Sequence, residues 1–323
     1  MQRIRAYSVE MVLVAILLAA VFFFGYLGYG LLRPEIIDEP FTGERALANV
    51  ARQLEFGVRS TGTEGSQRTG DWLVEQLRVL GWDVVIQPIA IGDTLAGRNI
   101  LGVRSPNQAG APVAILAAHY DTRLVADADP DPARQTLPPP GANANGSGVA
   151  VLLELARTLD VDASGYTVCL AFFDAEANAG LPGWAPYIGS QIFVDSQPES
   201  VPRCAAPQFV VELEQVGAAG QVFQQNAAAS AVQEAIWQTG ARLGWGETFA
   251  PAPETSEAGE PNAPPAADTL SPFAAAGVTV ARIAAADYPD AATMEDTLEQ
   301  VSATTLERVG RTLESWLEGE EPP

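Results

Sequence analysis

The chain of 323 residues has no lysine, one histidine and two cysteines, and each scarcity excludes a class of site. With His119 as the single imidazole, a zinc centre that needs two histidines cannot form, and a Ser–His or Cys–His mechanism would depend on that residue. Two cysteines make neither a disulfide framework nor a cysteine-rich metal site. The chain has 18 arginines and 40 acidic residues, which gives a net charge of -22. Such a surface repels phosphate backbones, so we expect no nucleic-acid partner.

Residues 11–32 form a run without a charged side chain, MVLVAILLAAVFFFGYLGYGLL. About 20 apolar residues suffice for a helix to cross a bilayer. Arg3 and Arg5 precede the run and an acid-containing linker, 33–40, follows it, so the positive-inside rule places residues 1–10 in the cytoplasm. We therefore expect a single-pass protein of the cell membrane, anchored through this transmembrane helix, with an extracytoplasmic domain. A cleaved signal peptide and a buried globular helix are the alternatives.

Strands and helices alternate along residues 41–318, which predicts one α/β domain followed by a short tail, 319–323. Apolar runs that end in polar residues predict buried central strands, and these lie at 112–121, 166–176 and 208–217. Apolar residues at helical spacing predict helices, and these lie at 43–54, 147–159, 230–244 and 302–317. The alternation favours a three-layer αβα sandwich with a mostly parallel mixed central sheet.

Polar side chains lie at the end of each predicted central strand. His119 and Asp121 end the first, Glu176 ends the second and Glu214 ends the third. Ligands of α/β sheets bind at the carboxyl ends of the strands. A histidine beside a carboxylate suits a metal ligand with its supporting acid, and a further carboxylate can serve as a general base. The alternatives are a histidine hydrogen-bonded in the core and acids solvated at the surface.

The two cysteines, Cys169 and Cys204, leave the redox state open. An extracytoplasmic domain would permit a disulfide between them. Cys169, however, lies within TVCLAFF, which reads as a buried strand. Two buried or half-buried thiols are therefore at least as consistent with the sequence as a bond.

Seven segments, in order, resemble the zinc-dependent M28 aminopeptidase family, especially its glutaminyl-cyclase-like branch. They are FGVRSTGTEGS, LAAHYDT, PGANANGSGVAVLLELART, LAFFDAEA, YIGSQIFV, LSPFAAAGV and ATMEDTLEQVS. They correspond to the family's Arg-x-x-Gly-Ser loop, His-x-Asp strand end, Gly-Ala-Asn-Asp loop and helix, Phe-Phe-Asp-x-Glu strand end, Gly-Ser-Arg segment, Asp-His-x-Pro-Phe loop and His-Thr-x-Glu-Asp-Thr segment. The resemblance extends over roughly residues 41–317 and implies the zinc-exopeptidase fold.

The sequence departs from the family where the family binds zinc. The resemblance implies metal ligands at three positions that here hold alanine, namely Ala144, Ala177 and Ala292. In the Asp-His-x-Pro-Phe loop, the Asp and His are replaced by Thr269 and Leu270. The family's remaining functional positions hold His119 as a ligand, Asp121 beside it, Glu176 as general base and Glu214 where a ligand Asp is common.

A catalytic zinc usually has three protein ligands and a water, and His119 with Glu214 supplies only two. We therefore expect no zinc cofactor and a catalytically inactive, M28-like pseudoenzyme whose cleft binds a peptide or protein partner. Two alternatives stay open. One is an active zinc aminopeptidase or glutaminyl cyclotransferase with a rearranged site. Other acids near the relevant segments, Asp174, Asp287, Asp290 and Glu295, could rebuild a site, one that would suit a hard cation such as calcium. The other is a scaffold subunit of a membrane complex.

Overall fold

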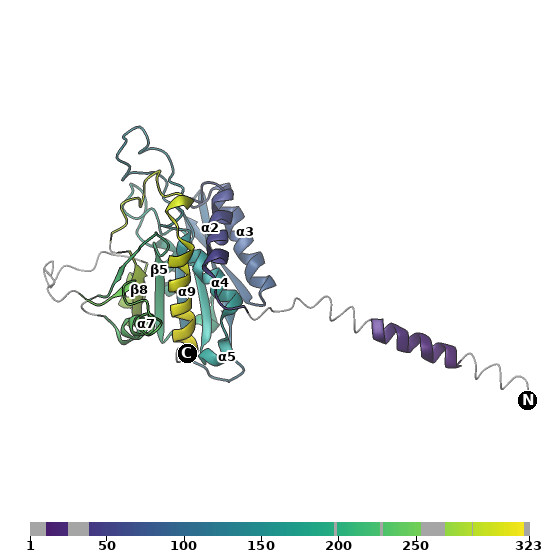
Figure 1. The fold of residues 1–323 in the computed structure, drawn as a ribbon. Coiled ribbons are helices and arrows are strands. Elements are labelled where there is room, and N and C mark those ends of the chain that lie inside the picture. The colour runs from purple at the N-terminus through teal and green to yellow at the C-terminus, as the bar shows by residue number, and fades with distance from the viewer. Residues whose placement is uncertain are drawn as a thin grey trace, which may run out of the picture. The chain divides into compact units, whose positions relative to one another are not determined.

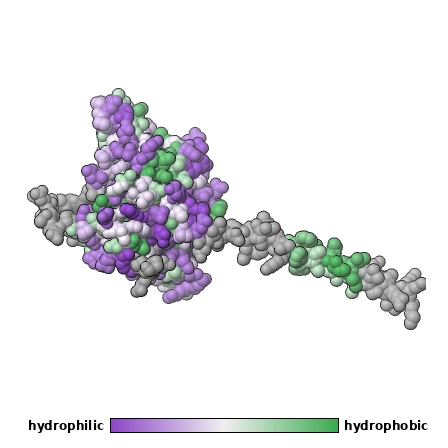
Figure 2. Space-filling view, in the orientation of Figure 1, coloured by the Kyte–Doolittle hydropathy of each residue, from purple (hydrophilic) through white to green (hydrophobic). Residues whose placement is uncertain are grey.

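The structure is a computed structural model that describes residues 11–24, 39–196, 199–226, 229–252, 269–285 and 287–319. The chain divides into two compact units, residues 1–39 and 40–323 (Figure 1). In the first unit, residues 11–24 form a helix whose large apolar side chains are exposed, and Figure 2 shows it as a hydrophobic segment. The rest of the predicted anchor, residues 25–32, lies outside the described residues, as do 1–10, most of the linker and 320–323. Within the described ranges, no helix combines the length and hydropathy needed to span a bilayer.

The second unit is built on a six-stranded sheet in the order β1-β2-β4-β3-β5-β8. The strands are β1 (Asp83–Ile91), β2 (Leu95–Arg104), β3 (Val113–His119), β4 (Thr167–Phe173), β5 (Phe209–Glu214) and β8 (Thr279–Ala284). Strands β4, β3, β5 and β8 pair in parallel, whereas β1 and β2 extend the sheet by antiparallel pairing. The structure thus confirms a mixed α/β fold with a mostly parallel central sheet.

Helices cover both faces of this sheet. One face packs against α3, α4 and α7, and α9 reaches it through the contact of Trp316 with Phe209, while α2 packs on α4 and α9; these helices lie in front of the sheet in Figure 1. The other face packs against α6 and α8. The helices are α2 (Gly43–Glu55), α3 (Glu64–Val79), α4 (Ser147–Thr158), α5 (Val161–Ser164), α6 (Ile188–Asp195), α7 (Ala231–Arg242), α8 (Ser271–Ala275) and α9 (Ala303–Glu318). Shorter elements are the 3-10 turns η1 (Pro202–Cys204) and η2 (Leu298–Gln300) and the strands β6 (Phe223–Gln224) and β7 (Phe249–Ala250).

Strand β4 shows why its sequence reads as an unbroken apolar run. Alternate side chains of a strand point to opposite faces, and both faces of β4 are buried. Val168, Leu170 and Phe172 join the core on one side. Cys169 and Phe173 join the core on the other. The parallel strands β3 and β5 are buried in the same way, and the edge of the sheet at which β4, β3 and β5 have their carboxyl ends carries the candidate site.

Cys169 and Cys204 form a disulfide, which the sequence left open. Both residues are fully buried. Cys169 points to the side of β4 that η1 covers, and Cys204 ends η1, so the bond ties η1 to the sheet. Sequence alone could not separate a buried thiol from a buried disulfide, because the pairing depends on how η1 packs against β4.

We expect the double substitution Cys169→Ala, Cys204→Ala to lower the free energy of unfolding by about 3–4 kcal/mol. The bond closes a loop with a sequence separation of 35, and removing it restores conformational freedom to the unfolded chain. Urea unfolding followed by circular dichroism measures the change. Wild-type protein unfolded with a reducing agent should lose a similar amount, while the double variant should not respond to the reducing agent.

Candidate functional site

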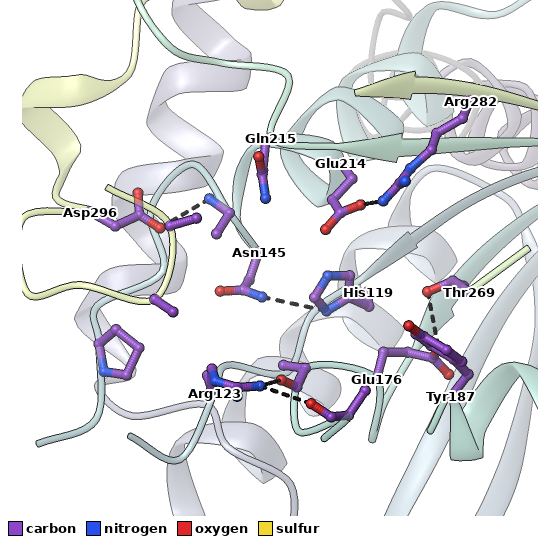
Figure 3. A pocket seen from close by; sticks show the side chains of 16 residues that line it. His119, Arg123, Asn145, Glu176, Tyr187, Glu214, Gln215, Thr269, Arg282 and Asp296 are labelled. Carbon is purple, nitrogen blue, oxygen red and sulfur yellow. Dashed lines mark hydrogen bonds and ion pairs between the residues drawn. The ribbon is translucent and has the colours of Figure 1, made fainter. Parts of the chain in front are cut away.

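A cleft of about 310 Å³ lies at the carboxyl edge of the central sheet (Figure 3). It is lined by His119, Arg123, Pro139, Ala144, Asn145, Glu176, Ala177, Ala179, Tyr187, Glu214, Gln215, Thr269, Arg282, Ala291, Ala292 and Asp296. The structure therefore brings together the three alanines at the expected ligand positions and three of the four expected polar residues. The fourth, Asp121, is fully buried beside His119.

His119 ends β3 and is held by Asp121, with Nδ1 3.2 Å from Oδ1 of the carboxylate. Because a carboxylate oxygen accepts, the Nδ1–H group of His119 donates this hydrogen bond to Asp121. Burial lowers the pKa of the imidazole, but the bond to Asp121 and the charges of nearby acids outweigh it and raise the pKa overall. Asp121 also accepts hydrogen bonds from the backbone N–H groups of Glu176 and Ala177. The carboxylate thus fixes both the imidazole and the turn that carries Glu176.

Glu176 is almost fully buried and has three hydrogen-bond donors around its carboxyl group. The backbone N–H of Ser190 lies 2.6 Å from Oε1, while Oγ of Ser190 and Oγ1 of Thr269 lie 3.1 and 2.9 Å from Oε2. Burial raises the pKa of Glu176 to about 8, although these hydrogen bonds act against the shift. A carboxyl group poised near neutrality in a cleft has the property of a proton-transfer group.

The raised pKa of Glu176 predicts a specific pH dependence of stability. Between about 4.5, the ordinary value, and about 8, the native state holds a proton that the unfolded state releases. The free energy of unfolding should therefore fall as pH rises through this window, with each pKa unit representing about 1.4 kcal/mol. We expect Glu176→Gln to remove this contribution to the pH dependence of the free energy of unfolding. Urea titrations of both proteins between pH 4.5 and 8 test it, and parallel profiles would contradict it.

The loop that carries Ala144 is held by two charged side chains, Asp296 and Arg59. Oδ1 and Oδ2 of Asp296 accept hydrogen bonds from the backbone N–H groups of Asn143 and Ala144, at 2.8 and 3.0 Å. Arg59 has no exposed surface and donates to the backbone carbonyls of Pro140 and Gly141. Burial lowers the pKa of Arg59 to about 10, so it stays a cation at neutral pH. Hydrogen bonds to Arg59 and to Asp296 therefore hold the backbone of this loop in place.

Glu214, expected at a ligand position, forms an ion pair with Arg282 of the neighbouring strand β8. Nε of the same guanidinium lies 3.2 Å from Oε2 of the buried Glu212. The sequence reading missed Arg282. Its signal is a charge within the otherwise apolar strand TVARIA, since a charge in such a strand needs a partner.

Tyr187 and Gln215 are further cleft residues that the sequence reading missed, and their backbone conformation marks both. Tyr187 and Gln215 have φ of 50° and 54°, in the left-handed region that side chains disfavour, and so does Ala292 at 55°. Ala175, which precedes Glu176, has φ of 63°. Such residues cost about 1–3 kcal/mol each and cluster at functional sites. Asn145 also lines the cleft and places Nδ2 3.4 Å from Nδ1 of His119.

The side chains of the cleft do not fit a catalytic zinc centre. Among the residues that the structure describes, no three His, Cys, Asp or Glu side chains are grouped so that they could hold a metal ion. Glu214 is paired with Arg282, and Asp296 is bound to the backbone of the Ala144 loop. A catalytic zinc usually takes three protein ligands.

The four acids considered as replacements do not complete such a centre. Asp174 is buried and accepts hydrogen bonds from Thr61 and from the backbone of Arg98. Asp287 and Asp290 line a separate pocket, and Glu295 forms an ion pair with Arg134.

Comparisons with known proteins agree with the fold. The sequence profile described as "Peptidase family M28" matches residues 99–317, more than half of the chain. A Zn-dependent exopeptidase from Parabacteroides distasonis superimposes with a TM-score of 0.73 at 26% identity, covering 87% of this chain and 99% of that one. The glutaminyl cyclase of Tannerella forsythia gives 0.72 at 27% identity, covering 87% and 100%.

Among curated proteins, one from Leptosphaeria maculans, named "Probable zinc metalloprotease", is 27% identical over 175 residues. The matched region covers 45% of this chain and 38% of that protein. This chain therefore spans well under half of that relative's length.

Proposed function

This chain belongs to peptidase family M28, and we propose that it is a non-catalytic member whose cleft binds the end of a peptide or a segment of a partner protein. The observation that carries the proposal is the content of the cleft. Alanine stands at 144, 177 and 292, and all three line one space with His119. Without a Lewis acid, a hydrolase of this type loses its activated water and several kcal/mol of transition-state stabilisation.

Glu176 cannot replace a metal by itself. A positioned general base contributes about 10²–10⁴-fold to a rate, far below what peptide hydrolysis requires. Its carboxyl group is also engaged by Ser190 and Thr269. We therefore assign to Glu176 the role of a buried polar anchor that orients the cleft wall.

Two features support a binding role for the cleft. The lining combines the amides of Asn145 and Gln215 with His119 and Tyr187, which suit the amide groups of a peptide backbone. The unfavourable backbone conformations at Tyr187, Gln215 and Ala292 persist around the cleft. If the cleft had no function, residues with ordinary backbone dihedral angles at these positions would make the protein more stable.

We also propose that residues 11–32 anchor the chain in the cell membrane and that the domain lies outside the cytoplasm. The uncharged run, the arginines before it and the apolar surface at 11–24 support this (Figure 2). The disulfide fits an oxidising compartment. Protease added to intact cells should cleave the domain, whereas protection until the membrane is opened would contradict this topology.

The experiment that tests the binding role uses the full chain in detergent. Peptides with free, acetylated and N-terminal glutaminyl ends are assayed for hydrolysis, for cyclisation and for their effect on the melting temperature. We expect no turnover, and a rise in melting temperature with one peptide class, since a ligand at 100 times its Kd stabilises the native state by about 2.7 kcal/mol.

The matched control is Ala177→Trp, which fills the cleft and should abolish the rise. Turnover that Glu176→Gln eliminates would contradict the proposal and favour an active enzyme. A rise that persists unchanged in Ala177→Trp would move the binding site out of the cleft.

A further inference from the structure

Arg282 brings a guanidinium into the cleft, where it meets Glu214 of the neighbouring strand β5 (Figure 3). The register of β5 and β8 places Arg282 directly opposite Glu212. Nε lies 3.2 Å from Glu212 Oε2, and the terminal nitrogen forms an ion pair with Glu214. One side chain thus contacts both carboxylates.

The glutamates need this cation. The side chain of Glu212 is only 1% exposed, that of Glu214 is 22% exposed, and the side chain of Arg282 is itself 36% exposed. An ionised carboxylate buried to that extent is strongly destabilising unless an opposite charge lies next to it. The charge of Glu212 also acts on His119, so the acidic groups of β5 and the imidazole of β3 share one electrostatic environment.

The family resemblance implies a zinc ion, and so a positive charge, in this cleft. Here the positions at which the family resemblance implies ligands are alanine, and the surviving acid at such a position, Glu214, faces Arg282. Arg282 reaches the acid from the strand next to it, so a side chain of this chain supplies positive charge at this edge of the cleft. A guanidinium remains charged at every physiological pH, which makes it a permanent substitute for an ion.

We propose that Arg282 is the resident cation of this cleft: it offsets part of the negative charge of Glu212 and Glu214, as a bound cation would, and keeps divalent ions out. The inference rests on the proposed loss of zinc, but it concerns a different quantity, the charge balance of the β5–β8 edge. It predicts that removal of the guanidinium exposes a need for positive charge that an added divalent cation can meet, because paired carboxylates are ligands for hard cations.

The test measures melting temperatures of the full chain in detergent, with millimolar Ca²⁺ or Mn²⁺ against NaCl of equal ionic strength. We expect Arg282→Met to melt on the order of 5–10 °C below the wild type. Calcium or manganese should restore part of the loss and should leave the wild type unchanged. The control is Arg123→Met, which removes the other arginine of the cleft. Arg123 is paired with Asp127 and not with the β5 glutamates, so this variant should show no cation response.

A triple variant, Glu212→Gln, Glu214→Gln, Arg282→Met, distinguishes the effect of the unpaired carboxylate charges from the effect of the lost packing of the arginine side chain. It should melt above Arg282→Met without any cation and should not respond to calcium. If Arg282→Met fails to fold, a folded triple variant still supports the charge-balancing role, and a triple variant that also fails overturns it. A folded Arg282→Met with no cation response overturns it too. Peptide turnover by the wild type would refute the proposed function while leaving these measurements valid.

Discussion

Replacement of the three cleft alanines by the side chains that the family resemblance implies should create a zinc site. We expect the triple variant Ala144→Asp, Ala177→Glu, Ala292→His to bind zinc on the order of 1,000-fold more tightly than the wild type, from millimolar or weaker to micromolar or tighter. All three positions line the space that His119 also lines. Ala292 has φ of 55°, a conformation in which histidine is tolerated better than most residues.

Isothermal titration calorimetry of the full chain measures this gain in affinity. The matched control carries Ala291→His in place of Ala292→His. Ala291 also lines the cleft, so the control adds the same groups one residue away. We expect the control to bind zinc at least tenfold more weakly than the triple variant. A folded triple variant with wild-type zinc affinity would mean that the alanines do not occupy the ligand positions.

Replacement of Arg59 by methionine should destabilise the domain by about 3–5 kcal/mol, the typical loss when one partner of a buried charged network is removed. Arg59 has no exposed surface and holds the carbonyls of Pro140 and Gly141, at 3.1 and 2.7 Å. Methionine keeps much of the length of the side chain but leaves these carbonyls without their donors, and an unsatisfied buried acceptor costs about 1–3 kcal/mol. Urea unfolding measures the loss.

The control for Arg59 is Arg68→Met in the adjoining helix α3. Arg68 is exposed and lies over the ring of Phe56, a contact worth about 1 kcal/mol or less at such a site. We expect the control to remain within about that amount of the wild type. If Arg59→Met were equally mild, the loop that carries Ala144 would have to be supported by Asp296 alone.

Most of the fold could be predicted because its signals are local. The strands β3, β4 and β5 are apolar runs ending in polar residues, and a strand buried on both faces requires that pattern. The polar residues at their ends meet because parallel strands end at one edge of a sheet. His119, Glu176 and Glu214 could therefore be placed together from sequence alone.

The residues that the sequence reading missed act through contacts between distant segments. Asp296 supports the Ala144 loop across more than 150 residues of chain, and Arg282 meets Glu214 only through the pairing of β5 with β8. The burial of Arg59 and the Cys169–Cys204 bond likewise depend on which loop covers which element. Local sequence patterns contain no information on these pairings. An arginine in an apolar strand, such as Arg282, or in a glycine-flanked loop, such as Arg59, does indicate that a buried partner is needed.

The central claim is that the cleft works without a catalytic metal, and zinc binding by the wild-type chain tests it most directly. The full chain is purified in detergent, equilibrated with zinc, passed through a desalting column and analysed for metal, and a calorimetric titration gives the affinity. We expect no stoichiometric zinc and no Kd tighter than about millimolar, since two poorly available ligands give little binding free energy. One zinc per chain at micromolar affinity would contradict it and would make the cleft an active-site candidate for metal-dependent peptide chemistry.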